Sequence, residues 1–371
     1  MRTELISPEG MSERDLGRWR ELADEAVEPN PFFEPGYVLS LASALGVLGT
    51  VMLLIVRDQT RWLACVPVHR VRRWHQIPLQ ALATWRGHLF FGLLGTPLAR
   101  ADRLTPTLAT LLAGLTTLDP GASAGVLEWM AVEGTVAQGM AGATAAAGVR
   151  PLGFERFERA VLRRKPEFTY LEETLSPKHR RELRRQWRKL GETAGGEPEV
   201  IDLAGDGERA ATEFVALEAA GKKSVTGQPI ASDPAQVAFF RELCSSFGAS
   251  GRMQMLALRA GDRTVAMQCS LRAGRTRYLL KVAYDERWAR FSPGILLEEA
   301  EMRRFHDDPT LTMIDSCADA NNATINRLWS DRRTLETIVL PAPGLKGRAV
   351  RPMLGAARTM RNRRMERKGL T

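Results

Sequence analysis

The spacing of hydrophobic residues along the chain predicts alternating helices and strands. Residues 12–28 and 104–116 carry apolar side chains at helical spacing, whereas 51–57 and 62–71 are short runs rich in β-favouring residues. After Lys165-Pro166 the same order begins again, with helices first and strands later. The strands expected in this second half are 199–203, 254–259, 263–272, 276–283, 311–316 and 335–340. The pattern predicts an α+β fold.

The two halves of the chain resemble each other. A shift of 202 positions aligns Leu54 with Leu256, Val56 with Leu258, Arg57 with Arg259, Ala64 with Ala266 and Arg70 with Arg272. These matches fall on two neighbouring predicted strands in each half. They agree with the shared order of elements, helices followed by antiparallel strands. We therefore expect two related domains, residues 1–165 and 166–341, followed by a tail of residues 342–371.

The longest uncharged run, residues 35–56, is the one candidate for a membrane span. It contains Pro35, Gly46 and Gly49, and its last residues align with a strand of the second half. A short helix followed by a strand explains these features better than a membrane span does.

Charge separates the tail from the rest of the chain. The formal net charge of the 371 residues is +9. Residues 342–371 hold nine Lys or Arg against one acid, a net +8, which leaves +1 for residues 1–341. The first interpretation of this tail is a disordered, solubilising segment. Contact with an anionic membrane surface is the second interpretation, and contact with nucleic acid is the third.

Cysteine usage and the N-terminus indicate a cytoplasmic protein. Cys65, Cys244, Cys269 and Cys317 show no paired spacing and no neighbouring His cluster, so we expect reduced, buried thiols and no metal site. The first residues are polar and do not resemble a secretory signal. If the tail binds lipid, the protein is also peripheral at the inner face of the cell membrane.

The stretch Thr276–Met302 has the pattern of an anion site. A predicted strand, 278–283, is followed by a polar loop with Arg287 and Arg290, and then Ser292-Pro293 opens an apolar helical run. Exposed N–H groups at a helix start bind anions, and arginines add charge-assisted bonds. An ordinary strand–helix connection with solvated arginines is the alternative.

Three other features are candidates for chemistry. Residues 176–190 form a predicted helix with seven Lys or Arg, either a solvated face or a polyanion surface. Asp315 ends a predicted strand, where it either caps a turn or contacts an amine. Lys281 lies within a strand and needs a charged partner if it is buried. The sequence contains no GxSxG, HExxH, Walker or Rossmann glycine motif, which excludes the commonest hydrolase, zinc-protease and nucleotide-binding classes.

Several segments together resemble a known family. They are Asn30–Pro35, Tyr170–Arg185, Lys281–Asp285 with Phe291–Glu298, Ile314–Ala318, and Leu328-Trp329. In these segments the chain is similar to the BioF2-like, or CelD-like, branch of the GNAT acyltransferase superfamily, which is related to the FemABX peptidyltransferases. The resemblance extends from about residue 30 to about residue 340.

The resemblance implies tandem GNAT-like domains, each a largely antiparallel twisted sheet flanked by helices. It implies acyl-CoA as a co-substrate, no permanently bound cofactor, and an amine on a sugar, peptide or lipid as acceptor. The implied catalytic residues are Asp315, Lys281 and Glu298. The implied donor-binding residues are Arg287, Arg290, Ser292, Gly294 and Ile295, and the implied substrate-binding residues are Tyr284, His179, Arg181 and Trp329.

Two other functions remain open on the sequence. Pro293 has no N–H and the loop before it lacks the glycine-rich spacing of ordinary GNAT enzymes, so a FemABX-like transfer from aminoacyl-tRNA is the alternative enzyme, although the nearly neutral body argues against it. A non-catalytic GNAT scaffold that binds membrane or nucleic acid is the third hypothesis. If the chain is an acyl-CoA-dependent N-acyltransferase, the basic tail favours an acceptor near a membrane, such as a long-chain amine.

Overall fold

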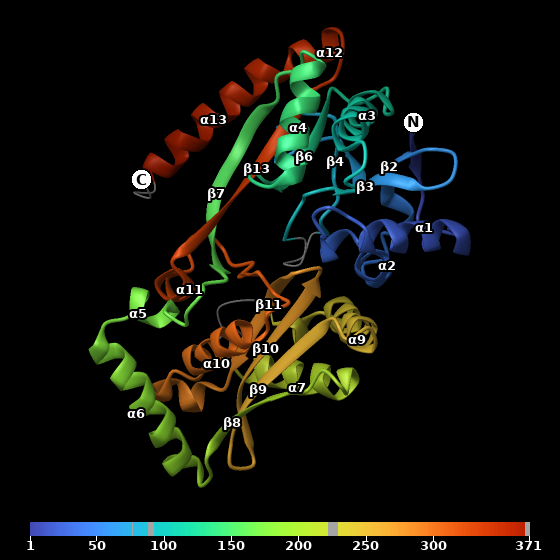
Figure 1. Cartoon of the computed structure of the whole chain (residues 1–371). Helices are drawn as coiled ribbons and strands as arrows, with labels where there is room; N and C mark the ends of the chain where they lie inside the picture. The colour runs from blue at the N-terminus through green and yellow to red at the C-terminus, as the bar shows by residue number, and fades with distance from the viewer. Residues whose placement is uncertain (76, 88–92, 222–228, 368–371) are drawn as a thin grey trace. The chain divides into compact units, whose positions relative to one another are not determined.

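A computed structural model describes residues 1–75, 77–87, 93–221 and 229–367 (Figure 1). The chain forms two compact units. Unit 1 contains Met1–Phe157 together with Thr334–Thr371, and unit 2 contains Glu158–Arg333. Each is built on a sheet with helices packed on its faces.

In unit 1 six strands follow the order β1, β2, β3, β4, β6, β13. Only the pair β4 and β6 is parallel; the other neighbours in this order are antiparallel. The strands are β1 (Arg2–Ile6), β2 (Met52–Arg57), β3 (Trp62–Val71), β4 (Ala81–Thr84), β5 (Leu98–Ala99, paired with β3), β6 (Ala124–Ala131) and β13 (Asp331–Pro341). The helices are α1 (Glu13–Asp24), α2 (Pro35–Ala44), α3 (Leu104–Thr117), α4 (Thr135–Ala146), α12 (Leu345–Arg348) and α13 (Val350–Arg367).

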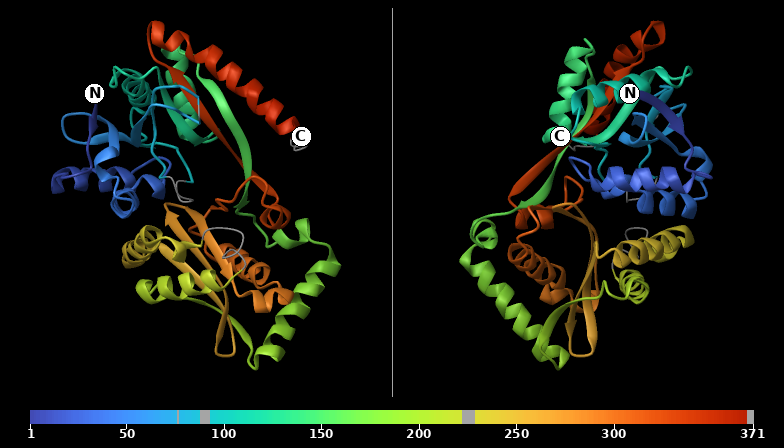
Figure 2. Two further views of the ribbon diagram at one scale, coloured as in Figure 1. Left: turned by 180° about the vertical axis from the view of Figure 1, so that it is seen from behind. Right: turned by 45° about the vertical axis from the view of Figure 1, so that its right-hand side comes forward.

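Unit 2 repeats this order with β8, β9, β10, β11, β12 and β7. Helices α7 and α9 cover one face of its sheet, and α10 covers the other (Figure 2). The strands are β7 (Leu152–Arg163), β8 (Pro198–Asp202), β9 (Met253–Ala260), β10 (Arg263–Ala273), β11 (Thr276–Tyr284) and β12 (Met313–Asp315). The helices are α5 (Tyr170–Thr174), α6 (Pro177–Ala194), α7 (Gly207–Ala220), α9 (Pro234–Ala249), α10 (Pro293–Asp307) and α11 (Ala323–Leu328).

The internal repeat extends to strand register. Val56 pairs with Ala64 between β2 and β3, and the residues 202 positions later, Leu258 and Ala266, pair between β9 and β10. The last strand of each sheet, however, comes from the other half of the chain: β13 completes the sheet of unit 1, and the end of β7 completes that of unit 2. The units therefore differ from the division expected at residues 165 and 341, because hydrophobic alternation shows that a segment is a strand but not which sheet it joins.

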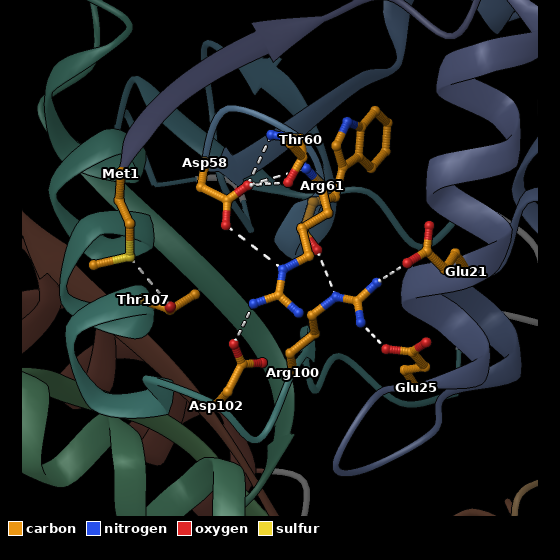
Figure 3. A network of polar contacts seen from close by, with 10 residues as sticks. Met1, Glu21, Glu25, Asp58, Thr60, Arg61, Arg100, Asp102 and Thr107 are labelled. Atoms are coloured by element: carbon orange, nitrogen blue, oxygen red, sulfur yellow. Dashed lines mark hydrogen bonds and ion pairs between the residues drawn. The ribbon is translucent and has the colours of Figure 1, made fainter.

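A buried arginine holds α1 on the sheet of unit 1 (Figure 3). Arg100 is 3% exposed, and its Nε donates to the carbonyl of Trp62 at 2.9 Å. The same guanidinium forms ion pairs with Glu21 and Glu25, which lie one turn apart along and just beyond α1. A buried charge is stable only when it is paired, so these acids fix the position of the helix.

The start of the basic tail is ordered, and the expectation of a disordered tail is wrong for the part that the structure describes. Helix α13 begins at Val350, and Val350 and Leu354 are buried in an apolar cluster with Val339 and Ile77. Two apolar side chains one turn apart form a stripe that packs on the sheet. The side chains of Arg358 and of residues 360–371 lie outside the described part, and with them most cations of the proposed lipid-facing segment.

Leu354→Ala is therefore expected to destabilise the protein by about 2–5 kcal/mol, because it opens a cavity in a packed core. The matched control is Leu345→Ala, since Leu345 is 80% exposed; its effect should stay within about 0.5 kcal/mol. Urea unfolding of the two variants measures the difference. Equal stabilities would show that α13 is not part of the core of unit 1.

Residues 35–57 are α2, a short 3-10 turn (Leu48–Thr50) and β2, as expected from the repeat. Among the described residues, no helix has the length and apolar character needed to span a bilayer. All four cysteines are free thiols, and Cys65, Cys244 and Cys269 are buried.

Candidate functional site

Two parallel strands of unit 2 separate after a short pairing. Strands β11 and β12 pair through Thr276–Tyr278 and Met313–Asp315 only. Strand β11 continues to Tyr284, while the chain after Asp315 turns at Cys317, whose φ is 51°. A bulge at Leu280, between the pairs Cys269–Lys281 and Ser270–Leu279, adds local twist to β11. We call the point after Tyr278 and Asp315 the fork. Ligands of mixed sheets commonly bind beyond the carboxyl ends of diverging parallel strands.

The start of α10 follows the fork along the chain. Ser292 occupies the cap position, as expected, but its φ is 52° and its hydroxyl makes no capping bond. Its carbonyl instead accepts the N–H groups of Ile295 and Leu296, at 2.9 and 3.1 Å. Because Pro293 has no N–H, Gly294 is the first-turn residue that keeps an N–H without a backbone partner in the described structure. This helix start has a much smaller capacity for anions than the sequence indicates.

The two loop arginines are on the surface. Arg287 is paired with Asp285, with 2.6 Å between Nη2 and Oδ2, and its side chain is 76% exposed. The hydrogen bond from Arg287 is the main reason why the pKa of Asp285 is lowered. Arg290 is exposed and lies over the ring of Phe291, 4.7 Å from its centroid. A ligand anion at Arg287 must therefore compete with Asp285.

Asp315 is the centre of a buried ion-pair cluster. Its carboxylate is fully buried and accepts from Arg159 Nη2 at 2.7 Å, Arg333 Nη1 at 2.9 Å and the N–H of Cys317 at 3.0 Å. Burial by itself would raise the pKa of Asp315, but the two guanidinium groups outweigh burial and lower it. A carboxylate held in this way links strands β7, β12 and the start of β13. Its geometry is that of a structural group rather than of a base that contacts an amine.

Lys281 has the charged partner that a buried lysine requires. Its Nζ lies 2.5 Å from Oε1 of Glu218 on α7, and the two side chains are 12% and 2% exposed. The other carboxylate oxygen of Glu218 accepts the N–H of Ile230 at 2.9 Å. An ammonium group has three donors, and Glu218 uses one of them. Lys281 is thus held in place on β11, and its other two donors have no partner among the described residues.

Glu298 differs from the other predicted carboxylate. It is 5% exposed on α10, and its Oε2 has no hydrogen-bond partner among the described residues. Burial, followed by the nearby charge of Glu301, raises its pKa to about 8. Glu301, one turn later, is fully buried and paired with Arg277 at 2.9 Å. A buried carboxylate with an unpaired oxygen and a pKa near neutrality has the properties of a proton acceptor.

The structure spreads the remaining predicted residues over three environments. Tyr284, at the end of β11, is partly buried, and burial raises its pKa; Gly294 and Ile295 lie near it or pack on the same apolar cluster. His179 and Arg181 are exposed on α6, where His179 Nδ1 lies 2.9 Å from the capping hydroxyl of Ser176. Trp329 is completely buried in the core. The structure therefore does not bring His179, Arg181 and Trp329 together with the fork residues.

Sequence reasoning missed the partners of these side chains. Arg159 and Arg333 were not singled out, because each reads as an ordinary strand residue until Asp315 is placed beside it. Gln268, on β10, was also missed; it is 1% exposed and neither amide atom has a partner in the described structure. Buried polar atoms without partners commonly mark a bound water or a ligand.

The corresponding position in unit 1 is filled by the chain itself. Strands β4 and β6 pair through Ala83 and Val126, and then residues 94–96 run beside β6. Gly95 N–H donates to the carbonyl of Trp129 at 3.0 Å, and Ala131 N–H donates to Thr96 Oγ1 at 3.2 Å. A side chain at Gly95 would overlap the carbonyl oxygen of Glu128, so this close approach requires glycine. Unit 2 is therefore the better candidate for a ligand site.

Comparison with known proteins agrees with this assignment. Residues 177–323 match the family described as acetyltransferase (GNAT) domain, a range that includes β11, α10 and β12. A search of curated proteins gave no match. The predicted relation to the GNAT superfamily and the GNAT-type α+β fold are thus confirmed, and the matched domain supports an acyltransferase.

Solved structures share the fold at low sequence identity. FemX is similar with a TM-score of 0.60 and 10% identity, covering 95% of this chain and all of FemX. A conserved protein of unknown function from Bacteroides thetaiotaomicron gives a TM-score of 0.56 and 11% identity, covering 91% and 99% of the two chains. The C-terminal domain of an Agrobacterium fabrum protein described as a lysylphosphatidylglycerol synthetase gives 0.52 and 9%, covering 88% and 90%. At these identities the similarities show a shared fold.

Proposed function

Because residues 177–323 form a GNAT domain, we propose that the chain is an N-acyltransferase that moves an acyl group from a thioester, such as acyl-CoA, to an amine. The observation that carries this proposal is the fork between β11 and β12, which lies within the matched range. The donor thioester would lie beside the unpaired end of β11, with its phosphate toward Gly294 and Arg290.

The proposed reaction forms one C–N bond and breaks one C–S bond. The amine nitrogen attacks the thioester carbonyl, and the thiol leaves as the amide forms. Glu298 accepts the amine proton, directly or through water, and this proton then goes to the leaving sulfur. Lys281 supplies positive charge for the developing oxyanion, a role supported by the two ammonium donors that have no partner among the described residues.

The acceptor is proposed to be an amine of a sugar, peptide or lipid. The nine Lys and Arg of residues 342–371 favour an acceptor near an anionic membrane, such as a long-chain amine, for a protein located in the cytoplasm and peripheral at the membrane. No permanently bound cofactor is needed for this chemistry.

A second candidate is aminoacyl transfer from tRNA to an amine. The similarity of the fold to FemX and the exposed cations of α6 favour it. The low net charge of residues 1–341 argues against a large nucleic-acid surface.

Mass spectrometry of reaction products tests both candidates. The purified chain is incubated with acyl-CoA of several chain lengths and a panel of amines that includes sphingoid bases and amino sugars. We expect one amide and one free thiol per turnover for at least one pair. Activity that appears only with charged tRNA and disappears with RNase would replace the first proposal by the second. Intact thioesters with every amine, and no use of charged tRNA, would contradict both.

A further inference from the structure

Two features of unit 2 indicate which kind of donor it binds. They are the basic outward face of α6 and the start of α10, which has few free N–H groups. Resting on the proposed transfer reaction, we infer that the acyl group is delivered by a small acidic carrier protein, which docks on the outward face of α6 and presents a phosphopantetheine thioester to the fork.

Helix α6 is amphipathic, and its charges lie on the side away from the core. Leu183 and Leu190 are buried, and Trp187 packs against the same apolar cluster. The exposed cations are Lys178, Arg181, Arg184, Arg185, Arg188 and Lys189, against the two acids Glu182 and Glu192. Intrahelical pairs use part of this charge, Arg185 with Glu182 and Arg188 with Glu192. The helix is 18 residues long, and its outward face keeps a net positive charge.

Helix α6 lies next to the loop that leads into α10. Helix α6 packs on the 3-10 turn Glu286–Phe291, and Leu183 and Leu190 belong to one apolar cluster with Trp288 and Phe291. The exposed Arg287 and Arg290 lie on that turn. The helix that carries the basic face therefore packs directly on the turn that leads to the segment expected to meet the phosphate of the donor.

The helix start of α10 suits a single phosphate better than a diphosphate. Coenzyme A carries a diphosphate and a ribose phosphate, and diphosphate sites use several first-turn N–H groups. Here Pro293 has no N–H, and Ser292 occupies those of Ile295 and Leu296, which leaves Gly294. Phosphopantetheine on a carrier has one phosphodiester, so Gly294 and Arg290 are enough. The other phosphates of CoA contribute binding energy that a carrier lacks, and contacts between the carrier protein and α6 would replace this contribution.

The shape and charge of α6 favour an acidic protein over the other polyanions. A membrane-surface helix turns its apolar side to the lipid, whereas the apolar side of α6 faces the core. RNA recognition relies on exposed aromatic rings that stack on bases, whereas Trp187 packs on the core. A row of exposed arginines complements the acidic helix of a small protein, where opposite charges speed association.

Binding of a defined carrier tests the inference without knowledge of the acceptor. Fluorescence anisotropy measures the affinity of the full chain for labelled palmitoyl-acyl carrier protein at low and at physiological salt. The variant Arg184→Glu/Arg188→Glu/Lys189→Glu is compared with Arg241→Glu/Arg275→Glu/Arg327→Glu, three exposed arginines elsewhere in unit 2. We expect at least roughly tenfold weaker binding for the α6 variant, within about twofold of the wild type for the control, and a difference that shrinks as salt rises.

Donor kinetics separate a failure of this inference from a failure of the proposed function. With a sphingoid base as acceptor, palmitoyl-carrier protein should give a lower KM than palmitoyl-CoA. Equal effects of the two triple variants on carrier binding, tighter binding of tRNA or of anionic vesicles through α6, or a preference for palmitoyl-CoA would overturn the carrier inference. In the last case the acyltransferase proposal stands, whereas thioesters that stay intact with every amine of the panel count against that proposal itself.

Discussion

Replacing Asp315 by alanine is expected to lower the free energy of unfolding by about 3–5 kcal/mol. The variant leaves Arg159 and Arg333 buried without the carboxylate that now pairs with both of them. A buried charge without a partner costs far more than a surface ion pair contributes. Urea unfolding at neutral pH measures the effect, and circular dichroism shows whether the variant still folds.

Asp102→Ala is the matched control, since Asp102 forms an exposed pair with Arg61 and is 45% exposed. Its cost should be about 0.2–1 kcal/mol. Because the pKa of Asp315 is lowered in the fold, its contribution is present above the ordinary carboxyl range and is lost as the pH falls below it. The wild type should therefore lose more stability in acid than Asp315→Ala. If Asp315→Ala and Asp102→Ala lower the free energy of unfolding equally, Asp315 does not have the structural role argued above, and the result would favour a catalytic role for it.

Glu298→Gln is expected to lower kcat by about 10²–10⁴-fold, the usual contribution of a general base. The wild-type rate should rise with pH through about 8, where Glu298 loses its proton, and this limb should be absent in the variant. The charge of Glu301 acts on Glu298, and Arg277 is paired with Glu301. The pH–rate profiles of the two proteins measure the effect.

Glu299→Gln provides the control on the same helix, because Glu299 forms a surface pair with Arg303. It should keep both the rate and the pH limb. Stability gives an independent readout, because the raised pKa favours the neutral form of Glu298 in the fold. The free energy of unfolding should fall as the pH rises from the ordinary carboxyl value of 4.5 to about 8, and should level off above that pH. Glu298→Gln should remove that fall. A variant with wild-type rate and profile would exclude Glu298 as the base.

The local elements of this fold can be predicted from hydrophobic spacing. The repeat of Leu54 and Val56 at Leu256 and Leu258 is reproduced in the strand register, and the helix after Ser292 begins at Pro293. The placement of β13 in the sheet of unit 1 and of the end of β7 in the sheet of unit 2 could not be predicted, because apolar alternation within a strand does not show which strands it pairs with.

The site was predictable only in part, because burial and partners decide what a polar residue does. Asp315 reads as a strand-end carboxylate, and nothing in the sequence indicates that arginines 156 positions before it and 18 positions after it neutralise it. Trp329 reads as a substrate contact and is a core residue. The sequence predicts Lys281 and Glu298 as candidates but not their surroundings: Lys281 is paired with Glu218, and Glu298 is buried with one oxygen that has no partner among the described residues.

Photo-crosslinking with an acyl-pantetheine analogue tests the central claim, a donor site at the fork of unit 2, most directly. The analogue carries a diazirine on its acyl chain, and the labelled peptides are identified by mass spectrometry. We predict labels in residues 279–296 and 315–320, which flank the fork, and protection by unlabelled acyl thioester. Protected labelling in residues 81–131 of unit 1, with none around the fork, would contradict the account.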